Sequence, residues 1–241
     1  MRRFLEVFAI ALGSAVVLAM LGFYGWTRVS RYPAFDAAAL LAGETRTAEG
    51  WYALEPEDEP TVGLVFYPGG LVDPAAYVPL MQRLGDGGVL AVIVPMPLDL
   101  AVFDIKRADE VIAAYPNVEH WAIGGHSLGG AMACEYVADH PDVFDGLVLL
   151  ASYPAESTDL SVTDVQTVLI YGTEDGVSGD VFEASLVRLP AGTVLVEIAG
   201  GNHAQFGDYG PQKGDGMASV SGEQQQRLTA EAILVLLERL E

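Results

Sequence analysis

Residues 123–130 read IGGHSLGG, so that a single serine, Ser127, lies between glycines. The residues before this serine are apolar, as in a buried strand, and those after it have a helical pattern. Glycines at both ends of a Gly-x-Ser-x-Gly pattern permit the tight, strained turn that exposes a serine hydroxyl between a strand and a helix. We therefore predict that Ser127 is a nucleophile, and the chain must supply partners that activate it.

The pattern from Gly125 to Gly129, with a strand before it and a helix after it, resembles the α/β-hydrolase family. The resemblance covers about residues 52–240 and implies a compact serine carboxylesterase without a cap domain. Glycine-rich turns of this kind also bind phosphate or serve packing alone. A dinucleotide site is disfavoured, because Gly-x-Gly-x-x-Gly is not matched and this is not the first strand-to-helix turn of the domain.

A serine hydroxyl needs a base to take its proton and an acid to orient that base. In the family that the chain resembles, the order is Ser, then Asp or Glu, then His. Of the four histidines, His126 is inside the turn, His120 begins a strand, and His140 precedes a proline at a helix end. Only His203 follows a late strand in a glycine-rich loop. We predict His203 as the base; the alternative is a loop histidine bonded to backbone.

The acid comes from the segment LIYGTEDGV, where Glu174 and Asp175 both follow a strand. The resemblance aligns its Gly-x-x-Asp turn, here GTED, with the acid position of the family, so we expect Asp175. Glu174 then reads as a solvated loop charge, although it remains the alternative. Asp180, a little further along, is expected to cap the start of a helix instead.

Acyl transfer also requires N–H donors for the negatively charged oxygen of the tetrahedral intermediate. The resemblance places one donor at Leu128, directly after the nucleophile, and the other in the loop YPGGLVDP. There we expect Gly70, with Leu71 as the alternative. The family often has histidine before this glycine pair, whereas this chain has Pro68, and PGG is also an ordinary turn signal.

The alternation of apolar strand patterns and amphipathic helix patterns predicts the fold. Strands are expected at residues 61–67, 88–95, 120–125, 146–152, 166–172 and 193–200, with helices at 75–84, 104–115, 128–138 and 223–240. Continuously apolar strands separated by helices indicate an α/β fold, a mostly parallel central sheet with helices on both faces. Residues 51–241 would form the catalytic domain, which follows a connector at 27–50.

The N-terminal residues predict a membrane segment. An uncharged run from Val7 to Trp26 follows two arginines, and about twenty helical residues cover a bilayer's hydrocarbon core. We expect a single-pass transmembrane anchor at residues 4–26, with a cleaved signal peptide as the alternative. Arg2, Arg3 and the amino terminus slightly outweigh Arg28 and Arg31, which favours an extracytoplasmic domain.

The charge of the chain excludes one class of partner. Twelve Lys and Arg residues stand against 33 acidic ones, which gives a formal net charge of -21 and would repel nucleic acid. Such a surface also repels itself unless salt screens it, because the Debye length falls to about 3 Å near 1 M salt. We expect a halophilic source, which equal stability in low and molar salt would contradict. A merely acidic, soluble protein is the alternative.

The remaining features predict no metal and no organic cofactor. Cys134 is the only cysteine, so that neither an internal disulfide nor a cysteine metal cluster can form, and we expect it to be a buried core residue. Residues 152–165 are too few for a cap domain. The long loop at 204–222 is expected either to cover the site as a lid or to be a solvated surface loop.

These features favour hydrolysis of a small-molecule carboxylic ester, with thioesters and amides as further substrates, through Ser127, His203 and Asp175. Perhydrolase, acyltransferase and lyase reactions use the same parts. Two alternatives stay open: a binding or scaffold protein without turnover, and a lipid-directed acyl hydrolase or acyltransferase. A preference for acetyl or butyryl esters would count against the lipid-directed alternative.

Overall fold

In the computed structural model, residues 2–179 and 181–240 are described, without the side chains of residues 2, 4–7 and 44. The predicted helix cap at Asp180 therefore lies outside the described residues. Backbone contacts divide the chain into two units, Met1–Arg31 and Tyr32–Glu241.

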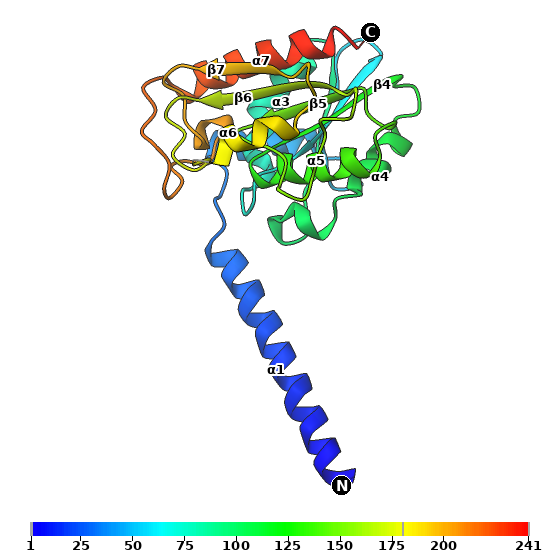
Figure 1. Cartoon of the computed structure of the whole chain (residues 1–241), viewed down its shortest axis with the longest axis vertical. Helices are drawn as coiled ribbons and strands as arrows, with labels where there is room; N and C mark the ends of the chain where they lie inside the picture. Colours follow the sequence, from blue (N-terminus) through cyan, green and yellow to red (C-terminus); the bar gives the residue numbers. More distant parts are fainter. Residues whose placement is uncertain (1, 180, 241) are drawn as a thin grey trace. The chain divides into compact units, whose positions relative to one another are not determined.

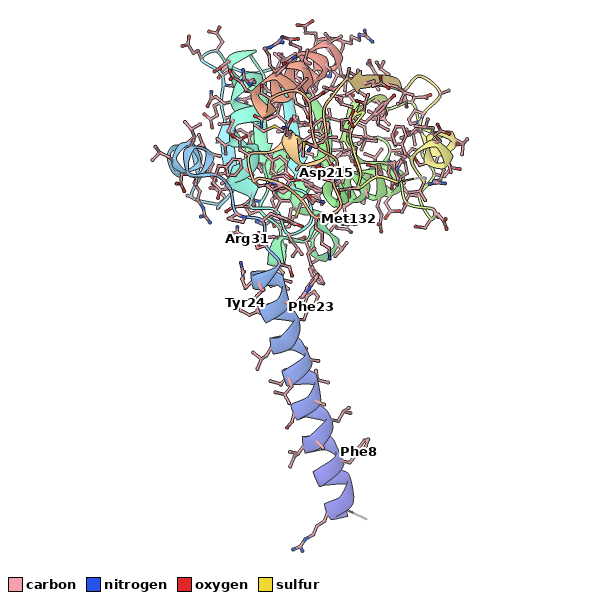
Figure 2. All side chains as sticks on the ribbon, turned by 90° about the vertical axis from the view of Figure 1, so that its left-hand side faces the viewer. Phe8, Phe23, Tyr24, Arg31, Met132 and Asp215 are labelled. Carbon is pink, nitrogen blue, oxygen red and sulfur yellow. The ribbon has the colours of Figure 1, made fainter. Side chains whose placement is uncertain are left out.

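The first unit is a single helix, α1 (Arg2–Val29). Its segment Phe8–Val29 has 22 residues and contains an 18-residue window with a mean hydropathy of 2.0 and no buried residue, so that it is long and apolar enough to cross a bilayer. Figure 2 shows Phe8, Phe23 and Tyr24 standing out from this helix. Signal sequences share this length and composition.

The second unit is built on one sheet. Within the described residues, seven strands follow the order β1-β3-β2-β4-β5-β6-β7. β1 pairs antiparallel with β3, and every other neighbouring pair is parallel, which confirms the predicted mostly parallel α/β fold. The strands are β1 (Tyr52–Leu54), β2 (Val62–Tyr67), β3 (Leu90–Ile93), β4 (His120–His126), β5 (Gly146–Leu150), β6 (Gln166–Gly172) and β7 (Val194–Ile198).

Helices cover both faces of this sheet, as expected for parallel strands whose two sides are apolar (Figure 1). One buried cluster lies between the sheet and α3 (Val78–Asp86) and α7 (Gly222–Leu237). A second lies under α4 (Arg107–Ala114), α5 (Leu128–Asp139) and α6 (Val181–Ser185). Short 3-10 turns complete the unit: η1 (Pro74–Tyr77), η2 (Pro97–Asp99), η3 (Ala101–Phe103), η4 (Leu186–Arg188) and η5 (Ala204–Phe206).

The segment that we expected to be a connector, residues 27–50, contains a further helix, α2 (Asp36–Thr45). Ala38 and Ala42 on this helix are buried. Alanine has the highest helix propensity, and an alanine-rich segment forms a helix once one side of it can pack against a core. The connector is therefore largely part of the second unit.

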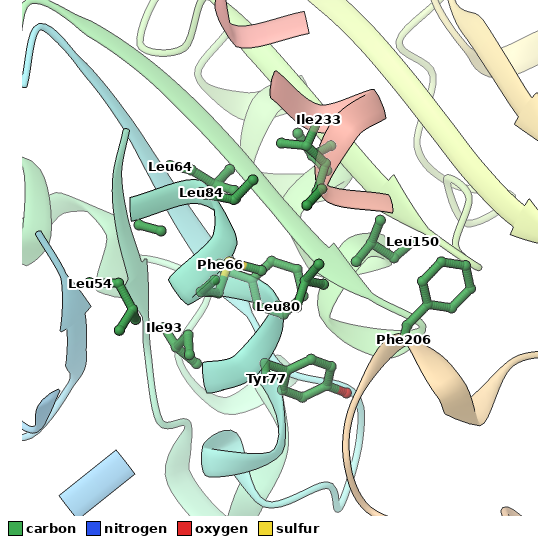
Figure 3. Packing of buried hydrophobic residues seen from close by; sticks show 14 of the residues in the cluster. Leu54, Leu64, Phe66, Tyr77, Leu80, Leu84, Ile93, Leu150, Phe206 and Ile233 are labelled. Atoms are coloured by element: carbon green, nitrogen blue, oxygen red, sulfur yellow. The ribbon is translucent and has the colours of Figure 1, made fainter. Parts of the chain in front are cut away.

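The core extends up to the ends of the strands. Figure 3 shows Tyr77, Leu150 and Phe206 in one buried cluster, although they come from η1, the end of β5 and η5. All three side chains are fully buried. Cys134, on α5, is fully buried in the second cluster, and burial raises the pKa of its thiol.

Candidate active site

Ser127 lies at the turn between β4 and α5. Its φ of 50° and ψ of -119° are values that residues other than glycine rarely adopt. Three hydrogen bonds hold this strained backbone: the Ser127 N–H donates to the Leu150 carbonyl at 3.0 Å, and the Ser127 carbonyl accepts from the Ala131 N–H at 3.1 Å and the Ser152 hydroxyl at 2.6 Å. Strain that the surroundings impose in this way is typical of functional turns.

The two glycines of the pattern let this turn approach the end of β2. A Cβ atom on Gly125 would lie 2.6 Å from the Tyr67 carbonyl oxygen, and one on Gly129 would lie 2.1 Å from the same oxygen. Both distances are shorter than any real contact of a Cβ atom. Only glycine at these positions allows the backbone to pack this closely, which explains the sequence pattern in physical terms.

His203 and Asp175, far apart in the sequence, are brought together by the neighbouring parallel strands β6 and β7. The His203 Nδ1 and Asp175 Oδ2 atoms are 2.9 Å apart, and only 1% and 5% of the two side chains are exposed. Glu174 is exposed, and its carboxylate accepts a hydrogen bond from the Thr173 hydroxyl at 3.4 Å. Of the two carboxylates, Asp175 is thus the one that contacts the histidine.

Asp175 stays ionised in this position. Burial on its own raises the pKa, but the hydrogen bond from His203, the charge of His203 and the bonds from Ser178 outweigh it and lower the pKa to about 2. The carboxylate also accepts from the Val177 N–H at 2.8 Å, the Ser178 N–H at 2.9 Å and the Ser178 hydroxyl at 2.7 Å. Because an ionised carboxylate only accepts, His203 donates from Nδ1, which leaves the lone pair of a neutral Nε2 free to take a proton.

The serine turn and His203 meet through the residue before the serine. The rings of His126 and His203 have their centroids 4.5 Å apart. The His203 Nε2 atom is buried and has no hydrogen-bond partner among the described residues. In particular, no hydrogen bond joins it to the Ser127 hydroxyl. Such a bond is often long in a site without substrate. The structure therefore joins His203 to Asp175 and places His203 against the residue before Ser127, without a bond from His203 to the serine.

Gly70 and Leu128, which carry the two predicted N–H donors, are close neighbours in the fold. A Cβ atom on Gly70 would be 3.0 Å from Leu128 Cδ2. No hydrogen bond among the described residues takes the N–H of Gly70 or of Leu128, which is the first residue of α5 and has no intrahelical acceptor. The N–H of Leu71 donates to the Asp99 carbonyl at 2.7 Å. Gly70 is therefore the better placed of the two alternatives.

Tyr77 was not singled out in the sequence, yet it joins the glycine loop to the serine turn. Its buried hydroxyl accepts from the Gly69 N–H at 3.0 Å and lies 2.8 Å from His126 Nδ1. Because the Tyr77 hydroxyl has no other acceptor among the described residues, its proton is assigned to His126, with Nδ1 as the acceptor. Burial, and then the charge of His203, hold the pKa of His126 well below its ordinary value, and the ring stays neutral.

Asp215 is a second residue that sequence reasoning missed. Its Oδ1 atom accepts from the N–H groups of His203 at 3.1 Å, Gly176 at 3.3 Å and Gly216 at 2.8 Å, and its Oδ2 atom from the Ala204 N–H at 2.8 Å. One carboxylate thereby fastens the acid loop to the histidine loop. The only sequence signal for Asp215 was the pair of glycines that flank it. Among 33 acidic residues this signal does not distinguish Asp215 from the others.

The long loop at residues 204–222, which carries Asp215 (Figure 2), packs on the acid and histidine loops. The Asn202 side-chain amide donates to the Gly216 carbonyl at 2.8 Å, and the Ser219 N–H donates to the Gly200 carbonyl at 2.8 Å. A Cβ atom on Gly176 would lie 2.5 Å from the Gly214 carbonyl oxygen. The loop is therefore a structural support of the two residues Asp175 and His203.

Solved structures share this fold. A predicted hydrolase from Thermoplasma acidophilum is 17% identical, with a TM-score of 0.58 over 77% of this chain and 92% of its own. Esterase 2 of Thermogutta terrifontis, phosphoramylated by tabun, is 16% identical, with a TM-score of 0.55 over 81% and 93% of the two chains. Est1E of Butyrivibrio proteoclasticus, solved with ferulic acid, is 13% identical, with a TM-score of 0.60 over 78% and 95%.

Sequence comparison adds curated relatives and one family. An uncharacterized protein of Mycobacterium tuberculosis is 31% identical over 119 residues, which are 45% of this chain and 32% of that protein. The matched part is thus about a third of the relative's length. Residues 63–227, more than half of the 241-residue chain, match the alpha/beta hydrolase family. With the parallel sheet and the serine turn after β4, this match makes the chain a member of the alpha/beta hydrolase family.

Proposed function

We propose that the protein is a serine hydrolase that cleaves carboxylic esters. The observation that carries the proposal is the buried contact of 2.9 Å between His203 Nδ1 and Asp175 Oδ2, with an unpaired Nε2 atom among the described residues. Ser127, in its left-handed turn, follows the histidine that packs on His203. Nucleophile, base and orienting acid are the three groups that this chemistry requires.

In the first step, His203 Nε2 takes the hydroxyl proton of Ser127 as the serine oxygen bonds to the ester carbonyl carbon. The carbonyl π electrons move to the oxygen, where the N–H groups of Gly70 and Leu128 would stabilise the negative charge. Asp175 holds His203 in the tautomer with the proton on Nδ1 and offsets the charge of the imidazolium. The histidine then protonates the leaving alcohol as the tetrahedral intermediate collapses to an acyl-enzyme.

In the second step, His203 takes a proton from water as the water oxygen attacks the acyl carbon. The second tetrahedral intermediate collapses, its proton returns from His203 to the Ser127 oxygen, and the carboxylic acid leaves. One ester and one water yield one acid and one alcohol. The reaction needs no metal and no organic cofactor.

Similarity to known proteins supports an ester as substrate. The Thermogutta terrifontis neighbour is named an esterase and is phosphoramylated by tabun, although at 16% identity the likeness extends to the fold alone. An organophosphorus reagent that mimics the tetrahedral intermediate should likewise react with Ser127 of this chain. Thioesters and amides pass through the same intermediate and remain secondary substrates.

We also propose that α1 anchors the hydrolase in a membrane, with the second unit on the extracytoplasmic side. The 22-residue apolar segment Phe8–Val29 and the arginines at its start support this location. Full-length protein should stay in the membrane fraction after a carbonate wash and begin at Met1 by mass. Release as a shortened soluble protein would show cleavage of a signal peptide instead.

Labelling with a fluorophosphonate tests the catalytic proposal. Full-length protein in molar salt should gain the mass of one adduct, and Ser127→Ala should gain none. Ser157→Ala, a change of an exposed serine, is the matched control and should be labelled like the wild type. If folded wild-type protein gains no adduct, the serine is not activated, and a binding or scaffold role replaces the hydrolase.

A further inference from the structure

The surface beside the predicted N–H donors is apolar, in a chain with 33 acidic residues. Four side chains of η2, η3 and the residue between them form what we term the apolar rim: Leu98, Leu100, Val102 and Phe103. Val102 and Phe103 are 49% and 51% exposed, and the two leucines are half-buried. Within residues 97–103, Asp99 is the one acidic residue.

The rim borders the candidate active site directly. A Cβ atom on Gly70 would lie 3.6 Å from Leu100 Cδ2, and the Leu71 N–H donates to the Asp99 carbonyl at 2.7 Å. The turn η3, which carries Val102 and Phe103, packs against α5, the helix that Leu128 begins. An acyl chain that leaves the ester carbonyl on this side would meet the rim first.

The backbone of the rim is held in an unusual conformation. Leu98 and Asp99 both have a φ of 58°, in the left-handed region that non-glycine residues seldom occupy. The Asp99 N–H donates to the Met96 carbonyl at 3.0 Å, and the Leu100 N–H to the Pro97 carbonyl at 3.1 Å. These bonds turn the chain so that apolar side chains remain at the surface although burying them would be favourable.

The chain enters the second unit at the same place. The Tyr32 N–H donates to the Leu71 carbonyl at 2.8 Å, and the Asp73 N–H donates to the Tyr32 carbonyl at 2.9 Å. Leu71 thus accepts from Tyr32 with its carbonyl and donates to Asp99 with its N–H. The ring of Tyr32 lies 5.7 Å from that of Tyr209, which lies 6.4 Å from that of His126.

Tyr32 is also the third residue after Val29, the end of the apolar helix. Three residues of extended chain span at most about 11 Å. This covalent limit holds for every orientation of the helix. A bilayer that contains the helix therefore comes within a short distance of Leu71, and through Leu71 of the rim and Gly70.

From the exposed rim and the short tether, we propose that the apolar rim rests on the lipid surface that holds α1, and that the enzyme cleaves esters of long acyl chains within that surface. The inference rests on the proposed hydrolase function and adds the substrate class to it. Apolar side chains that enter the interface favour binding in proportion to the area that they bury. The same membrane supplies the substrate, since a tether this short keeps its local concentration high.

The test uses full-length protein reconstituted in phosphatidylcholine vesicles. Two fluorogenic esters are compared: 4-methylumbelliferyl oleate dissolved in the bilayer, and 4-methylumbelliferyl butyrate in the surrounding water. Val102→Asp should lower the ratio of oleate to butyrate turnover about tenfold, since a charge would replace an apolar contact with lipid. Val162→Asp, at a valine that is 86% exposed in the segment between β5 and β6, is the matched control and should leave the ratio at the wild-type value.

The outcomes separate the two proposals. A wild-type enzyme that is labelled by fluorophosphonate and cleaves butyrate, but whose ratio does not respond to Val102→Asp, would retain the hydrolase function and overturn the lipid-surface proposal. An equal fall of the ratio in Val162→Asp would overturn it as well, because the effect would then be one of net charge. Absence of labelling and of turnover of both esters would overturn both proposals.

Discussion

The candidate active site has two halves that are built in different ways. In the half that would move protons, the carboxylates of Asp175 and Asp215 accept from the His203 ring and from the backbone N–H groups of His203 and Ala204. In the half that would stabilise the oxyanion, carbonyl-to-amide bonds join Leu71 to Tyr32 and to Asp99. The side chains of the adjoining apolar rim are partly exposed.

This difference separates two sensitivities. When a substitution removes a carboxylate that accepts hydrogen bonds from several N–H groups, all of these donors lose their partner at once. Backbone bonds survive the change of a side chain, so that the rim can vary in composition without moving Gly70. We expect the proton-transfer half to respond to charge and pH, and the oxyanion half to respond to the apolar character of what it contacts.

The largest effect is expected from Asp175→Asn. The amide can hold His203 in the wrong tautomer, with the proton on Nε2, and kcat for a soluble ester should fall about 10⁴-fold. Glu174→Gln, the adjacent carboxylate, should change kcat less than about twofold, as surface changes usually do. The reverse order of the two effects would assign the acid to Glu174. Steady-state kinetics with 4-methylumbelliferyl butyrate decides between them.

Tyr77→Phe should have the next largest effect, because Tyr77 joins the two halves of the site. Without the hydroxyl, the Gly69 N–H and His126 Nδ1 lose buried partners, which should cost about 3 kcal/mol of the free energy of unfolding. Tyr115→Phe removes an exposed hydroxyl 3.4 Å from Glu55 and should cost less than about 0.5 kcal/mol. Urea unfolding in molar salt measures both, and equal losses would deny Tyr77 its linking role.

Asp215→Asn should lower kcat about tenfold, since a small displacement of the acid or histidine loop would misplace the catalytic groups. The amide has one acceptor oxygen where the carboxylate has two, so that fewer hydrogen bonds join the acid and histidine loops to residue 215. The rate is counted per fluorophosphonate-reactive site, which removes any loss of folded protein, and KM should stay within about twofold. Asp142→Asn, at an exposed aspartate, is the control.

The smallest effect is expected in acid. Asp175 has its pKa lowered from 3.8 to about 2 in the folded protein, so that its ionised form favours folding. The stability that it contributes is complete above pH 3.8 and is lost as the pH falls through about 2. The difference in free energy of unfolding between wild type and Asp175→Asn should therefore shrink as the pH falls through this window. A constant difference down to pH 2 would mean that the carboxylate is not stabilised by His203.

The fold and the first elements of the site could be predicted because their signals are local. Alternating apolar strands and amphipathic helices indicated the parallel sheet, and glycines around Ser127 marked the turn. The antiparallel pairing of β1 with β3 could not be predicted, since nothing in three residues sets their neighbour. The helix α2 was concealed by its polar flanks in a segment that we interpreted as a connector.

Residues that act through backbone atoms were the ones that the sequence did not reveal. Asp215 matters because the N–H groups of Gly176, His203 and Ala204 converge on it, and this convergence exists only after folding. Tyr77 is likewise one aromatic residue among many until its hydroxyl lies between Gly69 and His126. A pattern indicates which side chains could do chemistry, whereas tertiary structure decides what holds them.

The burial of Cys134 has a practical consequence for measuring membrane depth. It is the one cysteine of the chain, it is fully buried, and burial raises the pKa of its thiol, so that thiol reagents should not modify the folded protein. A cysteine introduced at Val102 would then accept a nitroxide spin label at a single position. Its collision rates with oxygen and with a water-soluble nickel chelate would report directly how deep η3 lies in a bilayer.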